Sequence, residues 1–205
     1  MSFLICAAAA FVSVLALPQV ESFQEDRIDS NVNYLPYQDI VQAFNITPEF
    51  YWLYGVKYEN HVPFNSSCIY FDIKQLSAEG MNYSINYMNN DTWEKEEYIG
   101  TFDKTPAEHD QLPVARNHSN ILISMPKKGE DARRYTLIAS YKGSSVLGVL
   151  NGEKRDGCLV LATDSVARNP STFYCRIYIG MLAQISFGSL TKFLKRTAED
   201  LKCLV

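Results

Sequence analysis

The sequence is poor in histidine and lacks the short motifs by which common catalytic sites are recognised. Its 205 residues include three histidines, His61, His109 and His118, and all three fall in polar, loop-like segments. No GxSxG, HExxH or phosphate-loop pattern is present, and no CxxC pair points to a zinc or redox site. The sequence therefore predicts a protein that is not an enzyme and that holds no metal or other cofactor.

A strong charge of one sign is also missing. The chain carries 19 Lys and Arg against 23 Asp and Glu, a formal net charge of -4, and the charges are scattered along the sequence. Nucleic acids and anionic membranes select a basic face, so neither is expected as the main partner. The charged residues are predicted to form an ordinary solvated surface.

Long apolar runs are missing except at the amino terminus. The run Phe3–Ala16 contains no charge, and polar sequence follows from Glu21. It is shorter than the roughly 20 residues of a membrane-spanning helix and ends in small residues, which is typical of a secretory signal. We predict cleavage after Ala16, leaving residues 17–205 as one secreted, extracellular domain with no membrane span.

Removal of residues 1–16 discards Cys6 and leaves an even number of cysteines in an oxidising compartment. The four that remain predict two disulfides, because secreted domains commonly pair their cysteines. Four cysteines allow three pairings, and spacing alone does not choose among them. The four residues are Cys68, Cys158, Cys175 and Cys203.

The chain contains five Asn-x-Ser/Thr sequons, the acceptor motif for N-linked glycans. Such a motif can carry a glycan only where the segment faces solvent, so each is predicted to lie on the outside of the domain. Pro48 directly follows the first sequon and makes it the weakest candidate. The five asparagines are Asn45, Asn65, Asn82, Asn90 and Asn117.

Apolar and polar residues alternate in about eight short runs, which indicates strands with one buried face. Eight antiparallel strands can close into a barrel around one small ligand, although a two-sheet sandwich would show the same pattern. The segment Pro36–Phe44 is predicted to be a short helix, and Asn169–Pro170 is predicted to begin one or two helices packed outside the sheet. The predicted strands are 50–58, 69–74, 82–87, 97–103, 120–125, 134–141, 146–150 and 158–162.

Several segments of the chain have a familiar layout. They are Tyr37–Phe44 before the first strand, Cys68 in the second, Gly157–Leu161 in a late strand, Pro170 and Cys175 in a following helix, and the terminal Cys203. This layout resembles that of the tick salivary lipocalins typified by the histamine-binding proteins. The resemblance implies an all-β, eight-stranded antiparallel barrel, monomeric and secreted, that removes a small molecule from host signalling. It also implies the pairings Cys68–Cys203 and Cys158–Cys175.

The chain departs from the amine-binding members of this family at three places. Their two acidic tripeptides correspond here to Ser144–Val146 and Leu159–Leu161, which contain no acid, and the entry segment Asp39–Val41 keeps the acid but loses the aromatic ring. A charged amine taken out of water must meet a carboxylate, so loss of these acids disfavours histamine. Asp39 remains the main acidic candidate, followed by Asp72, Glu97 and Asp103.

Aromatic residues, in contrast, are abundant, with 13 Tyr and 11 Phe. They could line an apolar cavity with a few hydroxyls to orient a ligand, or they could simply pack a solid core. The expected ligand is a hydrophobic or amphipathic host mediator such as a sterol, fatty acid or eicosanoid. The alternatives are a biogenic amine, histamine or serotonin, and a surface interaction with a host immune-cell receptor. The predicted ligand-binding residues are Asp39, Phe50, Trp52, Tyr54, Phe71, Tyr83, Tyr87, Tyr98, Phe102, Tyr135 and Tyr141.

Overall fold

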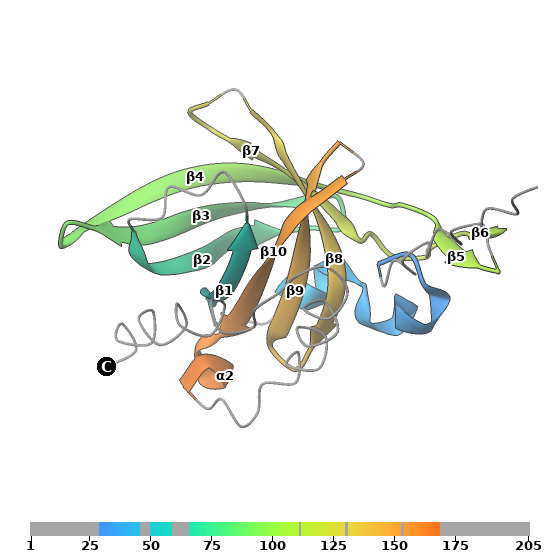
Figure 1. Ribbon diagram of the computed structural model, residues 1–205. Helices are drawn as coiled ribbons and strands as arrows, with labels where there is room; N and C mark the ends of the chain where they lie inside the picture. Colours follow the sequence, from blue (N-terminus) through green and yellow to red (C-terminus); the bar gives the residue numbers. More distant parts are fainter. Residues whose placement is uncertain are drawn as a thin grey trace, which may run out of the picture.

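The computed structural model describes residues 29–45, 50–58, 66–110, 112–129, 131–152 and 154–168 (Figure 1). The elements are the 3-10 helix η1 (Val32–Tyr37), α1 (Ile40–Phe44), β1 (Tyr51–Tyr58), β2 (Ser67–Leu76), β3 (Gly80–Asn89), β4 (Thr92–Asp103), β5 (Ala107–His109), β6 (Leu112–Val114), β7 (Ile121–Pro126), β8 (Arg133–Tyr141), β9 (Ser144–Asn151), β10 (Lys154–Thr163) and α2 (Asp164–Arg168).

Eight of these strands form a closed barrel in the order β1-β10-β9-β8-β7-β4-β3-β2, and every neighbouring pair is antiparallel. The short strands β5 and β6 form a separate hairpin that stands to one side of the barrel (Figure 1). The predicted lipocalin-like barrel is therefore confirmed, and the sandwich alternative is excluded.

Two apolar clusters lie on opposite faces of the barrel wall, as the period of two in a strand requires. On β9 and β10, Leu147 and Leu161 belong to an inner cluster to which all eight barrel strands contribute. Their neighbours Val146 and Val160 belong to an outer cluster together with Val166 of α2. The strands that α2 covers are thus apolar on both faces, whereas strands facing solvent alternate apolar with polar residues.

The helix α1 closes one end of the barrel. Ile40, Ala43 and Phe44 are buried and join the inner cluster. The Phe44 ring packs edge-on against the Tyr51 ring with 5.5 Å between centroids, and the Tyr51 hydroxyl donates to the Ala43 carbonyl at 2.9 Å. Asp39 caps the helix by accepting from the Gln42 amide. We call the opposite end of the barrel, where α1 does not lie, the open end.

A buried arginine holds this closed end together. Arg116 is 8 % exposed and donates to the Thr105 carbonyl at 2.6 Å, to Gln38 Oε1 at 2.5 Å and to the Asp29 carbonyl. Gln38 in turn donates to the Ile138 carbonyl of β8 at 2.9 Å. The guanidinium group therefore connects the segment around η1 with the link between β4 and β7 and, through Gln38, with the barrel wall.

The β3–β4 hairpin overhangs the open end. Thr92 to Glu97 of β4 pair with β3, while the pairing of β4 with β7 begins only at Tyr98. The two turn residues, Asn90 and Asp91, have φ angles of 47° and 60°, as a two-residue hairpin turn of the primed type requires. In Figure 1 this hairpin reaches farthest from the barrel on the left.

Three expectations about the elements need correction. β4 begins at Thr92 rather than at residue 97, because its first half belongs to the overhang and carries charged residues that obscure the apolar alternation. The predicted loop between β4 and β7 contains the hairpin β5–β6. The predicted helix Pro36–Phe44 is divided into η1, which contains Pro36, and α1.

Several predictions lie outside the described residues. These are the signal segment 1–16, the helices predicted after Asn169, the sequon asparagine Asn65, and the cysteines Cys175 and Cys203. Of the other cysteines, Cys68 is disulfide-bonded and Cys158 is buried on β10. The two pairings implied by the family resemblance remain predictions. Within the described part of the chain, no helix is long and apolar enough to cross a membrane.

Replacement of the buried arginine should lower stability. We expect Arg116→Met to reduce the free energy of unfolding by about 3 kcal/mol, because it removes a buried charge-assisted network and leaves three acceptors without this donor. Lys104→Met is the matched control, since exposed Lys104 donates one hydrogen bond, to the Asn117 carbonyl. Urea unfolding followed by fluorescence measures both, and equal stability of the two variants would contradict the role given to Arg116.

Candidate binding site at the open end of the barrel

Three stacked aromatic rings line the inner face of β2, β3 and β4. The Phe71 and Tyr83 rings lie 5.9 Å apart with an interplanar angle of 11°, and the Tyr83 and Tyr98 rings lie 5.2 Å apart at 17°. Tyr83 and Tyr98 are directly opposite each other in the β3–β4 register, which brings their rings together. All three residues are at most 6 % exposed and belong to the inner cluster.

A hydroxyl pair from distant strands lies beside these rings. Tyr83 Oη and Ser124 Oγ of β7 are 2.5 Å apart, and both residues are buried. Burial raises the pKa of Tyr83 far above its ordinary value, and Tyr135 raises it further, while the hydrogen bond with Ser124 and the positive charge of Arg133 act in the opposite direction. Arg133 acts in the same way on Tyr98. The positive charge of Arg133 therefore acts on both of these phenols.

Two glutamates continue the inner face of β4 onto the overhang. Glu96 accepts from the Tyr98 hydroxyl at 2.6 Å and from the Tyr87 hydroxyl at 3.0 Å, and Tyr87 Oη is also 3.0 Å from a Glu94 carboxylate oxygen. Desolvation is the main cause that raises the pKa of Tyr87 and of Tyr98, followed by hydrogen bonding to Glu94 and to Glu96, respectively. The phenols thus remain neutral donors to these carboxylates.

The inner face therefore changes in character along the barrel axis. Near α1 it is mostly apolar, with Leu137, Leu147 and Leu161 among its residues, and the hydroxyl of the buried Ser145 there donates to Ser140. Toward the open end come the stacked rings and buried hydroxyls, and then the exposed carboxylates of Glu94 and Glu96. Such a gradient suits a molecule with an apolar body and a polar end group. Among the described residues, no group of three or more His, Cys, Asp or Glu side chains could hold a metal ion.

Of the eleven residues predicted to bind a ligand, six lie on the inner face. Five of them belong to the inner cluster, and Tyr87 lies farther out, toward the overhang. Their position on the inner face is what the alternation of β2, β3, β4 and β8 predicts. The six are Phe71, Tyr83, Tyr87, Tyr98, Phe102 and Tyr135.

Three other predicted residues lie on the outer face. Trp52 and Tyr54 pack against the outer cluster, and the Trp52 indole donates to Asp164 of α2 at 2.9 Å. The Phe50 ring contacts those of Trp52 and Tyr70. In β1 it is the other alternating set, including Tyr51, that enters the barrel. Both sets are apolar, so the alternation of β1 does not say which one faces inward.

The remaining two predicted residues belong to the closed end. Tyr141 is 38 % exposed and packs edge-on against Tyr37, with 6.0 Å between ring centroids. Asp39 caps α1, and its other carboxylate oxygen lies 3.1 Å from His118 Nδ1. The Asp39 carboxylate thus lies at the closed end, where it caps α1.

The structure adds Glu94, Glu96 and Ser124 to the site, none of which was predicted. Glu94 and Glu96 lie two and four positions before Tyr98, so they face the same side of β4. A prediction that began this strand at Thr92 would have placed both glutamates on the inner face. Ser124 could not be found in this way, because its contact with Tyr83 joins positions 41 residues apart. The three acids that the sequence suggested besides Asp39 are paired with basic residues: Asp72 with Lys74, Glu97 with Lys95 and Lys127, and Asp103 with Arg134.

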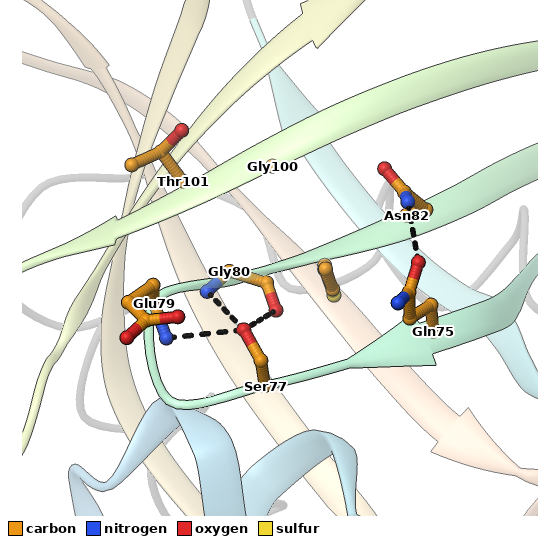
Figure 2. Close-up of a pocket in the computed structure, with 8 residues that line it drawn as sticks. Gln75, Ser77, Glu79, Gly80, Asn82, Gly100 and Thr101 are labelled. Carbon is orange, nitrogen blue, oxygen red and sulfur yellow. Dashed lines mark hydrogen bonds between the residues drawn. The ribbon is translucent and has the colours of Figure 1, made fainter.

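A hollow of about 320 Å³ lies where β2 turns into β3 (Figure 2). Its polar groups already bind one another: Asn82 donates to Gln75 at 2.9 Å, and the Ser77 hydroxyl accepts from the Gly80 amide at 3.2 Å. A side chain at Gly80 would come within 2.1 Å of the Gly100 carbonyl oxygen, so the two strands approach closely here. This hollow is a consequence of the tight hairpin, and we place the candidate site at the open end.

Comparison with known proteins supplies no family for this chain. No protein-family model matches the sequence, and no characterised protein matches it either. A comparison of structures finds Japanin from Rhipicephalus appendiculatus, in an orthorhombic crystal form bound to cholesterol. The alignment covers 69 % of this chain and 89 % of that chain, with 16 % sequence identity and a TM-score of 0.47. A likeness this distant does not extend to the ligand.

The buried tyrosines should titrate late. In an alkaline titration followed by absorbance at 295 nm, Tyr83 and Tyr98 should stay un-ionised after exposed tyrosines have titrated near their ordinary pKa of about 10. In the unfolded chain these phenols ionise near pH 10, before they do in the folded protein. The stability that they contribute is therefore complete below about pH 10 and declines as the pH rises toward their folded pKa values. Tyr83→Phe should remove part of the late absorbance change. If it instead removes part of the change near pH 10, Tyr83 is not desolvated.

Proposed function

We propose that this protein is a secreted carrier that takes a hydrophobic or amphipathic host mediator, such as a sterol, fatty acid or eicosanoid, into its barrel. By removing the mediator from solution it would weaken host immune or inflammatory defence. The proposal includes export directed by residues 1–16, a single binding domain over residues 17–205, and the two disulfides implied by the family resemblance.

The observation that carries this proposal is the polarity gradient of the inner face. Leu137, Leu147 and Leu161 occupy the part of the interior near α1, where a ligand's hydrocarbon would be removed from water. The Tyr83–Ser124 pair, Tyr98 and the charge of Arg133 lie toward the entrance, where one hydroxyl or carboxylate of the ligand could be bound. The helix α1 closes the other end, so a ligand would enter with its apolar part leading.

The second candidate, a biogenic amine, is supported by Glu94 and Glu96. Two carboxylates that share the hydroxyl of Tyr87 are suited to an ammonium group, and aromatic rings lie directly behind them. Both glutamates are exposed, and water weakens charge pairing at such positions. We therefore rank the amine below the amphipathic ligand.

The direct test is to identify what the protein carries. Protein secreted from eukaryotic cells should release a lipid in about equimolar amount on extraction with organic solvent, and native mass spectrometry should show the complex. An empty extract together with calorimetric binding of histamine or serotonin would replace the first candidate by the second. Receptor binding without any small ligand would favour a surface function and contradict both.

Filling the interior should abolish binding of the lipid. Val149 is 4 % exposed and lies opposite Tyr135 in the β8–β9 register, so Val149→Trp places a large ring beside the site. We expect at least a tenfold loss of affinity. Ile99→Trp is the matched control, because Ile99 is 49 % exposed on the outside of β4. Thermal unfolding checks that both variants fold, and undiminished lipid binding by folded Val149→Trp would place the ligand elsewhere.

Two conservative variants separate the ligand classes. Tyr83→Phe keeps the ring but removes the hydroxyl, and should weaken binding of an amphipathic lipid by about tenfold, the effect of one buried hydrogen bond. Glu96→Gln should leave lipid affinity nearly unchanged but weaken an amine by a similar factor. Calorimetry with a fatty acid and with serotonin measures both. The opposite pattern, with lipid affinity sensitive only to Glu96, would overturn the assignment of the head group to Tyr83 and Ser124.

A further inference from the structure

The turn of the overhanging hairpin combines an N-glycosylation sequon with full exposure. Asn90, Asp91 and Thr92 form the sequon, and all three residues are exposed. Asn90 has a φ angle of 47°, so it occupies the first position of a tight turn instead of a paired strand position. Both the amide to be modified and the threonine hydroxyl that completes the motif are therefore on a protruding tip.

The sequon at Asn82 belongs to the same hairpin but lies within a paired strand, not in an exposed turn. Asn82 lies inside β3 between β2 and β4, and its amide donates to Gln75 Oε1 at 2.9 Å. Its hydroxyl residue, Ser84, is 1 % exposed and accepts from Asn86 at 3.1 Å. A glycan on this position would have to be accommodated against a packed sheet, whereas one on Asn90 would project into solvent.

An exposed indole lies close to the Asn90 tip. Trp93 is 52 % exposed on the outer face of β4, opposite Met88, and its ring centroid is 5.7 Å from that of Tyr70. The exposed indole on this projecting hairpin is open to contact with other protein molecules. Trp93 is only three positions from Asn90, within reach of a branched oligosaccharide attached there.

We propose that Asn90 is an N-glycan attachment site and that its glycan shields Trp93 from contact with other protein molecules. The modification forms a bond between Asn90 Nδ2 and the anomeric carbon of the first sugar. The bond from that carbon to a lipid-linked pyrophosphate breaks, the pyrophosphate leaves, and the amide nitrogen loses one proton. The inference rests on the export included in the proposed function, but not on the identity of any ligand.

Site occupancy tests the first half of the proposal. The protein is secreted from insect or mammalian cells with a heterologous signal in place of residues 1–16, so that export does not depend on the predicted signal. Peptide mapping after enzymatic deglycosylation in heavy-oxygen water marks each modified asparagine. We expect Asn90 to be modified in most molecules and in a larger fraction than Asn82. An unmodified Asn90, or higher occupancy at Asn82, would overturn the assignment.

Self-association tests the second half. Thr92→Ala removes the sequon and should raise the self-association constant, measured by sedimentation, by about tenfold, because Trp93 becomes accessible. Adding Trp93→Ser to that variant should restore the original value. Thr101→Ala, an exposed threonine of β4 outside any sequon, is the matched control and should change neither glycan nor association. Loss of the Asn90 glycan without stronger association would refute the shielding, whatever the protein binds inside its barrel.

Discussion

Closure of the sheet between β1 and β2 is the interaction on which the rest of the structure depends. Within the described part of the chain, two residue pairs join these strands, Tyr51 with Phe71 and Trp52 with Tyr70, against seven pairs between β1 and β10. On the outer face of the barrel, where β1 pairs with β2, the Trp52 and Tyr70 rings contact each other, and the Phe50 ring contacts both. Aromatic pairs contribute about 0.5–1.5 kcal/mol each beyond simple burial, so these rings support a short ladder. Residues that the sequence suggested as ligand contacts thus have a structural role.

Closure of the sheet gives the barrel an inner and an outer face. The helix α1 packs against one end of the barrel, so the two ends differ. At one end the packing of Phe44 on Tyr51 and the Arg116 network fill and fasten the barrel. At the other, β4 continues past its neighbour β7 and carries Glu94 and Glu96 beyond that strand. The β3–β4 hairpin therefore provides the rim of the candidate site on its inner face and an exposed indole, Trp93, on its outer face.

Alternation along single strands correctly assigned several aromatic side chains to the inner face of the barrel. Tyr83 in β3 and Tyr98 in β4 follow the period of two, and both rings lie inside. The same reasoning failed for β1 because both of its faces are apolar and covered, Tyr51 inside the barrel and the partly buried Trp52 against α2, so that neither set is marked by polar neighbours. The glutamates were missed for a different reason. The first half of β4 overhangs the barrel and carries mostly charged residues. It therefore lacks the apolar alternation by which the start of a strand is recognised in a sequence.

The sequence by itself determined the number of barrel strands and the alternating faces of most of them, because the pattern of each strand depends on residues two positions apart. Only the tertiary structure decided which face of β1 turns inward, that Asp39 caps a helix instead of meeting a ligand, and that Tyr83 meets Ser124 across 41 positions. These outcomes depend on contacts between segments distant in the chain. No local pattern specifies them, because the partner of each side chain is set by the register and closure of the whole barrel.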